Sequence, residues 1–141
     1  MPARAGGLAW ESYEWALETA ERLGVSEVSI VSSTYRSLAV LDWEIGEWEA
    51  AQLHVQPHRY QVDGLTVHGV ARRGPWHPRG VVLVDCADEQ ILAEIEGHCP
   101  AAIAAVAQWP DDIATWRSAH LPVRIGGGNA PHHRPFRLDL N

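Results

Sequence analysis

Residues Gly80 to Gly128 read GVVLVDCADEQILAEIEGHCPAAIAAVAQWPDDIATWRSAHLPVRIGGG, and this stretch decides the fold class. Three short apolar runs in it, at Val81–Val84, Ala101–Ala107 and Leu121–Ile125, alternate with two segments of helical pattern. Continuous apolar runs of this length are typical of strands covered on both faces, and strands that alternate with helices form parallel sheets. The stretch therefore predicts a three-layer, Rossmann-like α/β domain.

Both predicted helices of this stretch begin with residues that favour a helix N-terminus. Asp88 stands at an N-cap position, ahead of an apolar stripe that ends at Ile95. Pro110 opens the second helix, and the two acidic residues after it suit the positive end of the helix dipole. The small side chains of Ala101–Ala107 imply that a helix packs closely over that strand.

The N-terminal half of the chain adds two helices, a strand and a hairpin. Apolar spacing predicts a helix over residues 11–23, a strand at Val28–Val31 and a second helix within Arg36–Gln52, where Gly46 weakens the pattern. An Asp-Gly dipeptide between two β-type runs predicts an antiparallel hairpin excursion at residues 53–73. We therefore expect a mostly parallel sheet of about five strands.

The chain is expected to form one domain with two loose ends. We assign residues 1–9 to a loose N-terminal leader, 10–126 to a single α/β domain and 127–141 to a C-terminal tail. The tail carries Arg and His residues, and it could dock on the body of the domain or on a second subunit. Its FRLDL segment could instead add to the sheet as an edge strand.

Composition excludes several classes of protein. The net charge of −7 argues against broad nucleic-acid binding, which needs a basic face. All 11 basic residues are Arg, so chemistry based on lysine is excluded. No apolar run is long enough for a signal peptide or a membrane span, and two cysteines do not form a disulfide framework. We therefore expect a soluble cytoplasmic protein that does not bind membranes.

Ligands of open α/β sheets bind in the crevice outside the carboxyl ends of the strands. A small hydroxyl residue ahead of a helix exposes backbone N–H groups, and a nearby arginine adds the charge that suits a phosphate or carboxylate. The candidate ligand-binding residues at these strand ends are Ser32, Ser33, Thr34, Arg36, Asp85, Asp88, Trp109 and Asp111.

Each of these candidates also has a structural interpretation. Ser33 or Thr34 could simply cap the following helix. Asp85 could order the next turn together with Asp88, and Trp109 could pack in the core or at an edge. The turn from Ser32 to Arg36 contains no glycine, so the usual dinucleotide-binding fingerprint is absent.

Metal and nucleophile patterns are weak. The chain has eight histidines, but none forms a recognised ligand spacing, and Pro57 lies between His54 and His58. We therefore predict no metal and no cofactor. Cys86 follows a strand and could be a nucleophile near a helix N-terminus, but no partner histidine is specified, so we favour an inert thiol.

Two tryptophans stand among acidic residues in the second predicted helix. The acids are Asp42, Glu44, Glu47 and Glu49. They could serve in acid–base catalysis or hold a divalent ion, although a charged outer helix face explains them more simply. If Trp43 points outward while Trp48 points inward, the helix presents an apolar and acidic patch of the kind that binds a partner.

These observations favour a non-enzymatic interaction or accessory module that self-associates, as a homodimer, or binds another protein. The alternative is a domain that binds a small anion, such as a phosphate or nucleotide, at the strand carboxyl ends. A third hypothesis is an enzyme whose site the sequence does not reveal.

Overall fold

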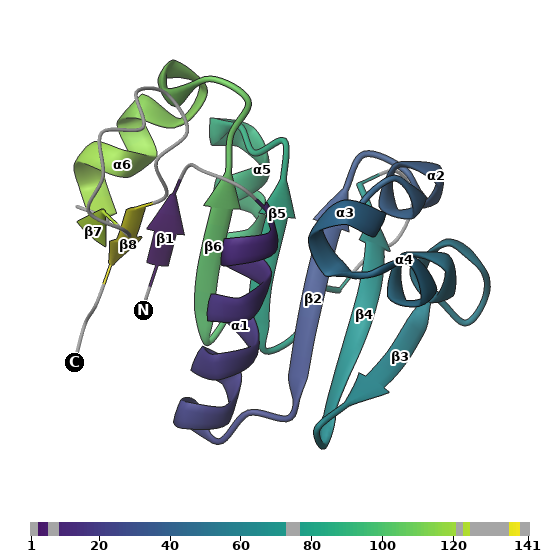
Figure 1. Ribbon diagram of the computed structural model, residues 1–141. Coiled ribbons are helices and arrows are strands. Elements are labelled where there is room, and N and C mark those ends of the chain that lie inside the picture. Colours follow the sequence, from purple (N-terminus) through teal and green to yellow (C-terminus); the bar gives the residue numbers. More distant parts are fainter. Residues whose placement is uncertain (1–2, 6–8, 73–76, 121–122, 125–135, 139–141) are drawn as a thin grey trace.

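The computed structural model describes residues 3–5, 9–72, 77–120, 123–124 and 136–138 (Figure 1). In these residues, eight strands form one sheet in the order β3-β4-β2-β5-β6-β1-β8-β7. The strands are β1 (Ala3–Ala5), β2 (Glu27–Ser32), β3 (Arg59–Val62), β4 (Leu65–Ala71), β5 (Val81–Asp85), β6 (Ala102–Val106), β7 (Val123–Arg124) and β8 (Phe136–Leu138).

Five neighbouring strands of this sheet, in the order β3-β4-β2-β5-β6, confirm the predicted sheet. β2 pairs in parallel with β4 and with β5, and β5 pairs in parallel with β6. The antiparallel hairpin joins β3 to β4 through Asp63 and Gly64, whose φ angles of +50° and +81° are those that a tight hairpin turn requires. The hairpin places β3 at the edge of the sheet, while β4 belongs to its parallel part.

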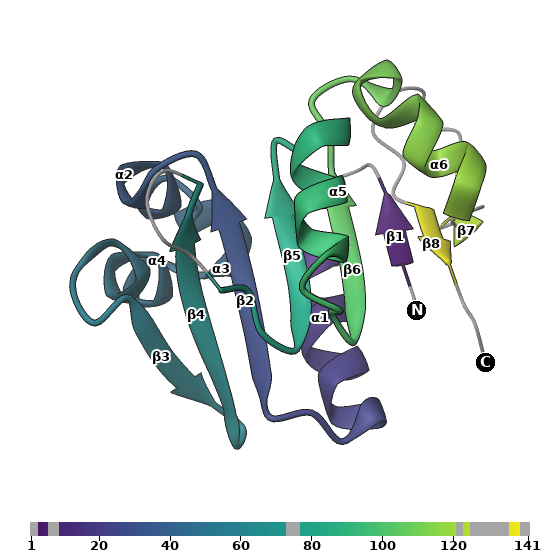
Figure 2. The ribbon, with the colours of Figure 1, turned by 180° about the vertical axis from the view of Figure 1, so that it is seen from behind.

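Helices cover both faces of this sheet (Figures 1 and 2). α1, α3 and α4 lie on one face, in front in Figure 1, and α5 lies on the other face, in front in Figure 2. The helices are α1 (Ala9–Leu23), α2 (Tyr35–Ala39), α3 (Asp42–Ile45), α4 (Glu47–His54), α5 (Glu89–Glu96) and α6 (Ala114–His120), with the 3₁₀ helix η1 (Pro110–Ile113) ahead of α6.

Neighbouring strand residues pack into two separate cores, one on each face. Ile30 and Leu83 belong to the core under α1 and α4, whereas Val31 and Val82 belong to the core that also contains Ile91 of α5. Because every strand residue from Val81 to Val84 is buried, this part of the chain reads as one continuous apolar run.

The single helix predicted within Arg36–Gln52 is wrong in detail, because the segment forms three short helices. Gly46 separates α3 from α4 and adopts a φ of +113°, which is outside the helical region. Trp48 lies after this break and is 59% exposed, so the arrangement considered above, in which Trp48 points inward, is not found. Trp43 is 91% exposed.

Both ends of the chain contribute short strands. β1 lies inside the segment expected to be a loose leader and pairs in parallel with β6, while β8 lies in FRLDL and pairs antiparallel with β1. Strands of three residues show no periodicity, so sequence patterns do not reveal them. The rest of the tail, including Gly126–Gly128 and Arg134, lies outside the described residues. Among the described helices, none has the length and apolar character needed to cross a membrane.

Candidate functional site

The carboxyl ends of β2 and β5 bring two of the predicted residues together. Ser32, at the end of β2, is buried, and its hydroxyl donates a hydrogen bond to Oδ2 of Asp85 at 3.4 Å. The pairing of β2 with β5 in parallel puts both strand ends at one edge of the sheet, at the top in Figure 1. The hydroxyl of Ser32 therefore faces a carboxylate.

The other members of the predicted anion-binding turn lie just beyond. Thr34 is the N-cap of α2: its Oγ1 accepts a hydrogen bond from the backbone N–H of Ser37 at 3.0 Å, and the two hydroxyl groups lie 2.9 Å apart. Ser33 and Arg36 are exposed. The structure thus uses the Thr34 hydroxyl to cap the helix, which is the structural interpretation given above.

Two carboxyl groups with raised pKa values interact at this edge of the sheet. Burial raises the pKa of Asp85, although hydrogen bonds from Ser32 and Cys86 oppose the shift. Burial also raises the pKa of Glu44 in α3, and the charges of Asp85 and Asp42 add to that effect. Oε2 of Glu44 is buried without a hydrogen-bond partner. This environment favours protonated carboxyl groups and disfavours an anionic ligand.

Cys86 shows no sign of activation. Burial raises the pKa of its thiol, and the charge and hydrogen bond of Asp85 raise it further. A nucleophilic cysteine needs the opposite shift, because the thiolate is the reactive form. This direction of the pKa shift favours the inert interpretation of Cys86.

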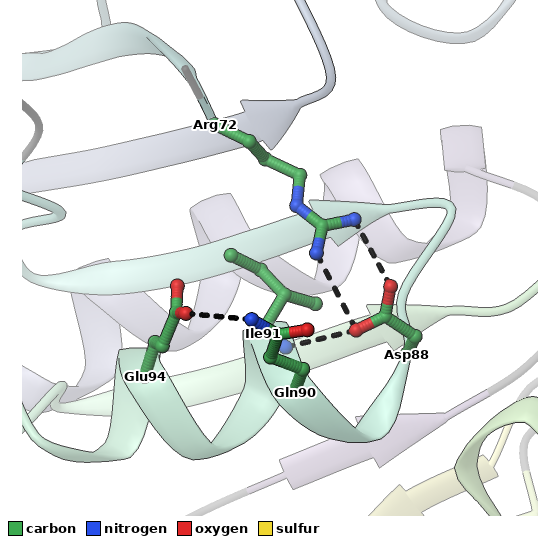
Figure 3. A network of polar contacts seen from close by, with 5 residues as sticks. All are labelled: Arg72, Asp88, Gln90, Ile91 and Glu94. Atoms are coloured by element: carbon green, nitrogen blue, oxygen red, sulfur yellow. Dashed lines mark hydrogen bonds and ion pairs between the residues drawn. The ribbon is translucent and has the colours of Figure 1, made fainter. Parts of the chain in front are cut away.

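Asp88 is bound on both carboxylate oxygens (Figure 3). Its Oδ1 accepts the backbone N–H of Ile91 at 2.9 Å, so Asp88 is the N-cap of α5. Arg72, which follows β4, donates to Oδ2 at 3.1 Å and to Oδ1 at 3.4 Å. Burial alone would raise the pKa of Asp88, but these hydrogen bonds and the Arg72 charge lower it. Sequence patterns do not reveal the role of Arg72, because its link to Asp88 depends on the order of the strands.

The candidates after β6 lie on the surface. Trp109 is 60% exposed, and its backbone N–H donates to Oδ2 of Asp112 at 3.3 Å. Asp111 is exposed in η1. Trp109 therefore does not belong to either core, and the structure gives it no contact with Ser32 or Asp85 among the hydrogen bonds of the described residues.

A second candidate region is the α3–α4 surface, defined here by Val40, Asp42, Trp43, Glu47 and Trp48. All five side chains are exposed, and the exposed fractions of Val40, Trp43 and Trp48 are 67%, 91% and 59%. The ring of Trp48 contacts the edge of Tyr60 in β3, with ring centroids 5.8 Å apart. Exposed indoles and carboxylates are therefore carried by two short helices that are anchored in the core through Ile45 and Leu53.

Neither a metal site nor a known relative identifies the chemistry. Across the described part of the chain, no three His, Cys, Asp or Glu side chains are grouped so that they could hold a metal. No family model matches the chain, and neither the curated proteins nor the solved structures include a significant match. The function must therefore be inferred from the residues themselves.

Proposed function

We propose that this chain is a non-enzymatic interaction module whose α3–α4 surface binds a basic segment of another protein. The exposed indole of Trp43 is the observation that carries the proposal, because this large apolar residue is 91% exposed to solvent. Contiguous exposed apolar groups with a polar rim mark interaction sites, and tryptophan is enriched among residues that dominate binding energy.

The charges around the indoles define the chemistry of the partner. Asp42 and Glu47 are exposed beside Trp43 and Trp48 in the chain. Arginine and lysine side chains can pair with such carboxylates and also stack over indole rings. A second copy of this chain that docked through its own α3–α4 surface would meet this surface with like charge, because both carry exposed carboxylates. Self-association would therefore need another face and stays a prediction.

The carboxyl edge of the sheet supports this choice over an anion site there. The Thr34 hydroxyl caps α2, the Ser32 hydroxyl donates to Asp85, and the pKa of the half-buried Asp85 and Glu44 is raised. We also propose that the module works in the cytoplasm. Cys86 and Cys99 are both free and exposed, which suits a reducing compartment.

The proposal can be tested with an array of short amphipathic peptides that carry net charges from strongly basic to strongly acidic. We expect binding to increase with positive charge and to weaken as salt rises, because exposed charges are screened over about 8 Å at physiological ionic strength. Trp43→Ala should weaken binding of the best peptide by about tenfold or more.

Trp109→Ala is the matched control, since it removes an indole of 60% exposure that lies outside the α3–α4 surface. Peptide binding should survive in this variant. Equal affinity for basic and acidic peptides, or equal losses in Trp43→Ala and Trp109→Ala, would refute the proposal.

A further inference from the structure

Among the described residues, the half of one sheet face formed by β3 and β4 is not covered by a helix along most of its length. Seen from behind, α5 lies over β5 and β6, whereas no described helix lies in front of the middle of β4 on that side (Figure 2). A cavity of about 270 Å³ lies on this open half. Its described lining includes Arg59 of β3, His68 of β4, and His77 and Arg79 from the segment ahead of β5.

Strand register places the basic side chains on one face. His68 is paired with Arg59 on one side and with Ser29 of β2 on the other. Directly paired residues of neighbouring strands point to the same face of a sheet, so these three side chains share the open face. The next residues along β2 and β4 on this face, Val31 and Val70, belong to the core that contains α5.

The segment that carries Arg79 is attached firmly to the sheet. The Ser29 hydroxyl accepts the backbone N–H of Arg79 at 2.7 Å and donates to its carbonyl oxygen at 3.0 Å. Gly80 follows in a left-handed conformation with a φ of +67°, and a Cβ there would overlap the carbonyl oxygen of Glu27. Arg79 is therefore positioned by backbone contacts that do not depend on a ligand.

The positive charge of this cavity is only partly neutralised. Oε1 of Glu27 lies 3.8 Å from both Nη1 of Arg79 and Nε2 of His68, which is beyond hydrogen-bonding distance. Nε2 of His68 is buried and has no hydrogen-bond partner. Two arginines and an unsatisfied ring nitrogen thus line one cavity in a chain whose net charge is −7.

We infer that this cavity binds a small phosphate monoester, with the guanidinium groups of Arg59 and Arg79 on the phosphate and Nε2 of His68 as a further hydrogen-bonding group. A guanidinium group can donate two parallel hydrogen bonds to a phosphate, and buried polar atoms normally have a hydrogen-bond partner. Tyr35 also lines the cavity, and its ring stacks on His58 with centroids 3.6 Å apart. The organic part of the ligand would lie against this ring.

Proton uptake should accompany binding. Burial lowers the pKa of His68, Glu27 opposes that shift, and Arg79 and Arg59 reinforce it. His77 is the other histidine of the described lining, which also contains Tyr35, Arg59 and Arg79. A bound phosphate would favour the protonated ring, so the pKa of His68 should rise when the ligand binds.

The test uses the full chain with ribose 5-phosphate, inorganic phosphate and unphosphorylated ribose, with calorimetry for affinity and NMR for the His68 ring. We expect millimolar or tighter binding of the phosphate ester, no binding of ribose and an upward pKa shift of His68. Inorganic phosphate that binds as tightly as the ester would support the phosphate site and remove the role given to Tyr35.

Two arginine variants distinguish this cavity from the strand-end site. Arg59→Ala should weaken binding by about tenfold or more, because it removes a direct charge contact. Arg36→Ala, which removes an exposed arginine outside the described lining, should leave binding unchanged. No binding of either phosphate, binding of plain ribose, or a loss in Arg36→Ala without one in Arg59→Ala would overturn the inference.

Discussion

The α3–α4 surface and the open half of the opposite sheet face have opposite chemistry on one scaffold. The first presents exposed indoles next to carboxylates in the chain, and its helix α3 also carries the half-buried Glu44, which interacts with the half-buried Asp85. The second presents Arg59 and Arg79 around a cavity, with the buried ring of His68 in its wall. Both are built on the same strands, because alternate residues of β2 and β4 point to opposite faces.

This comparison shows how a strongly acidic chain can have a local basic site. A net charge of −7 describes the whole molecule, but the field at one cavity depends on which side chains the register brings to that face. The short helices α3 and α4 carry the acidic surface, and their exposed side chains suit binding to a macromolecule. The uncovered basic side leaves a hollow suited to a small ligand.

The substitution expected to disturb the basic face most is Gly80→Ala. A Cβ at this position would overlap the backbone of Glu27 and would separate the Arg79 segment from β2. We expect a loss of about 4 kcal/mol or more in the free energy of unfolding, measured by urea titration, or failure to fold. Gly64→Ala is the control, since its φ is +81° but no atom lies within 4 Å of the new Cβ. This control should lose only about 1–2 kcal/mol. Equal losses in the two variants would show that the contact with Glu27 is unimportant.

The acidic side has its own buried support, a hydrogen bond between the hydroxyl groups of Tyr13 and Tyr60 at 2.7 Å. Burial raises the pKa of both, so neither ionises near neutral pH. Tyr13→Phe should cost about 1–3 kcal/mol, because the Tyr60 hydroxyl stays buried without a partner.

Replacing both tyrosines by phenylalanine should be far less costly than the sum of the two single changes. A urea-denaturation double-mutant cycle measures this coupling. Additive losses would mean that the hydroxyl groups stabilise the fold independently.

The features that could be predicted from the sequence are those that depend on local pattern. Buried strands β5 and β6, the Asp88 cap and the Asp-Gly turn of the hairpin each follow from residues close together in the chain. The position of Ser32 and Asp85 at one edge of the sheet followed from one further rule, that parallel strands end at a common edge, whereas their hydrogen bond was not predicted.

The basic cavity could not be predicted, because it depends on sheet order. Arg59, His68 and Arg79 come from three separate segments, and only the order β3-β4-β2-β5 brings them to one face. The exposure of Trp48 was missed for a local reason. One continuous helix was expected, whereas Gly46 breaks it and changes the direction of every side chain that follows.

The two sides should respond to pH in opposite ways. The pKa of Asp85 is raised above its ordinary value of 3.8, so its contribution to stability is present below that pH and is lost as pH rises through the raised value. The pKa of His68 is lowered below 6.5, so its contribution is present above that pH and is lost as pH falls through the lowered value.

Asp85→Asn should therefore stabilise the protein at neutral pH by about 0.5–2 kcal/mol and have little effect in acid. His68→Gln should reduce the loss of stability between neutral and mildly acidic pH. Urea titrations at a series of pH values measure both slopes. The contrast would be contradicted if Asp85→Asn raised the free energy of unfolding equally at every pH, or if His68→Gln left the loss of stability at mildly acidic pH unchanged.

The smallest expected effect belongs to the residue on which the proposed function depends. Trp43 is 91% exposed, so Trp43→Ala should change the free energy of unfolding by no more than about 0.5 kcal/mol. Trp116→Ala, at a buried tryptophan of the opposite core, should cost about 3–5 kcal/mol in the same urea titration. An exposed indole that contributes little to stability leaves apolar surface in contact with water, which a binding role would explain. If Trp43→Ala destabilised the fold by an amount close to that of Trp116→Ala, the indole would be a structural residue and the α3–α4 surface would lose its main binding group.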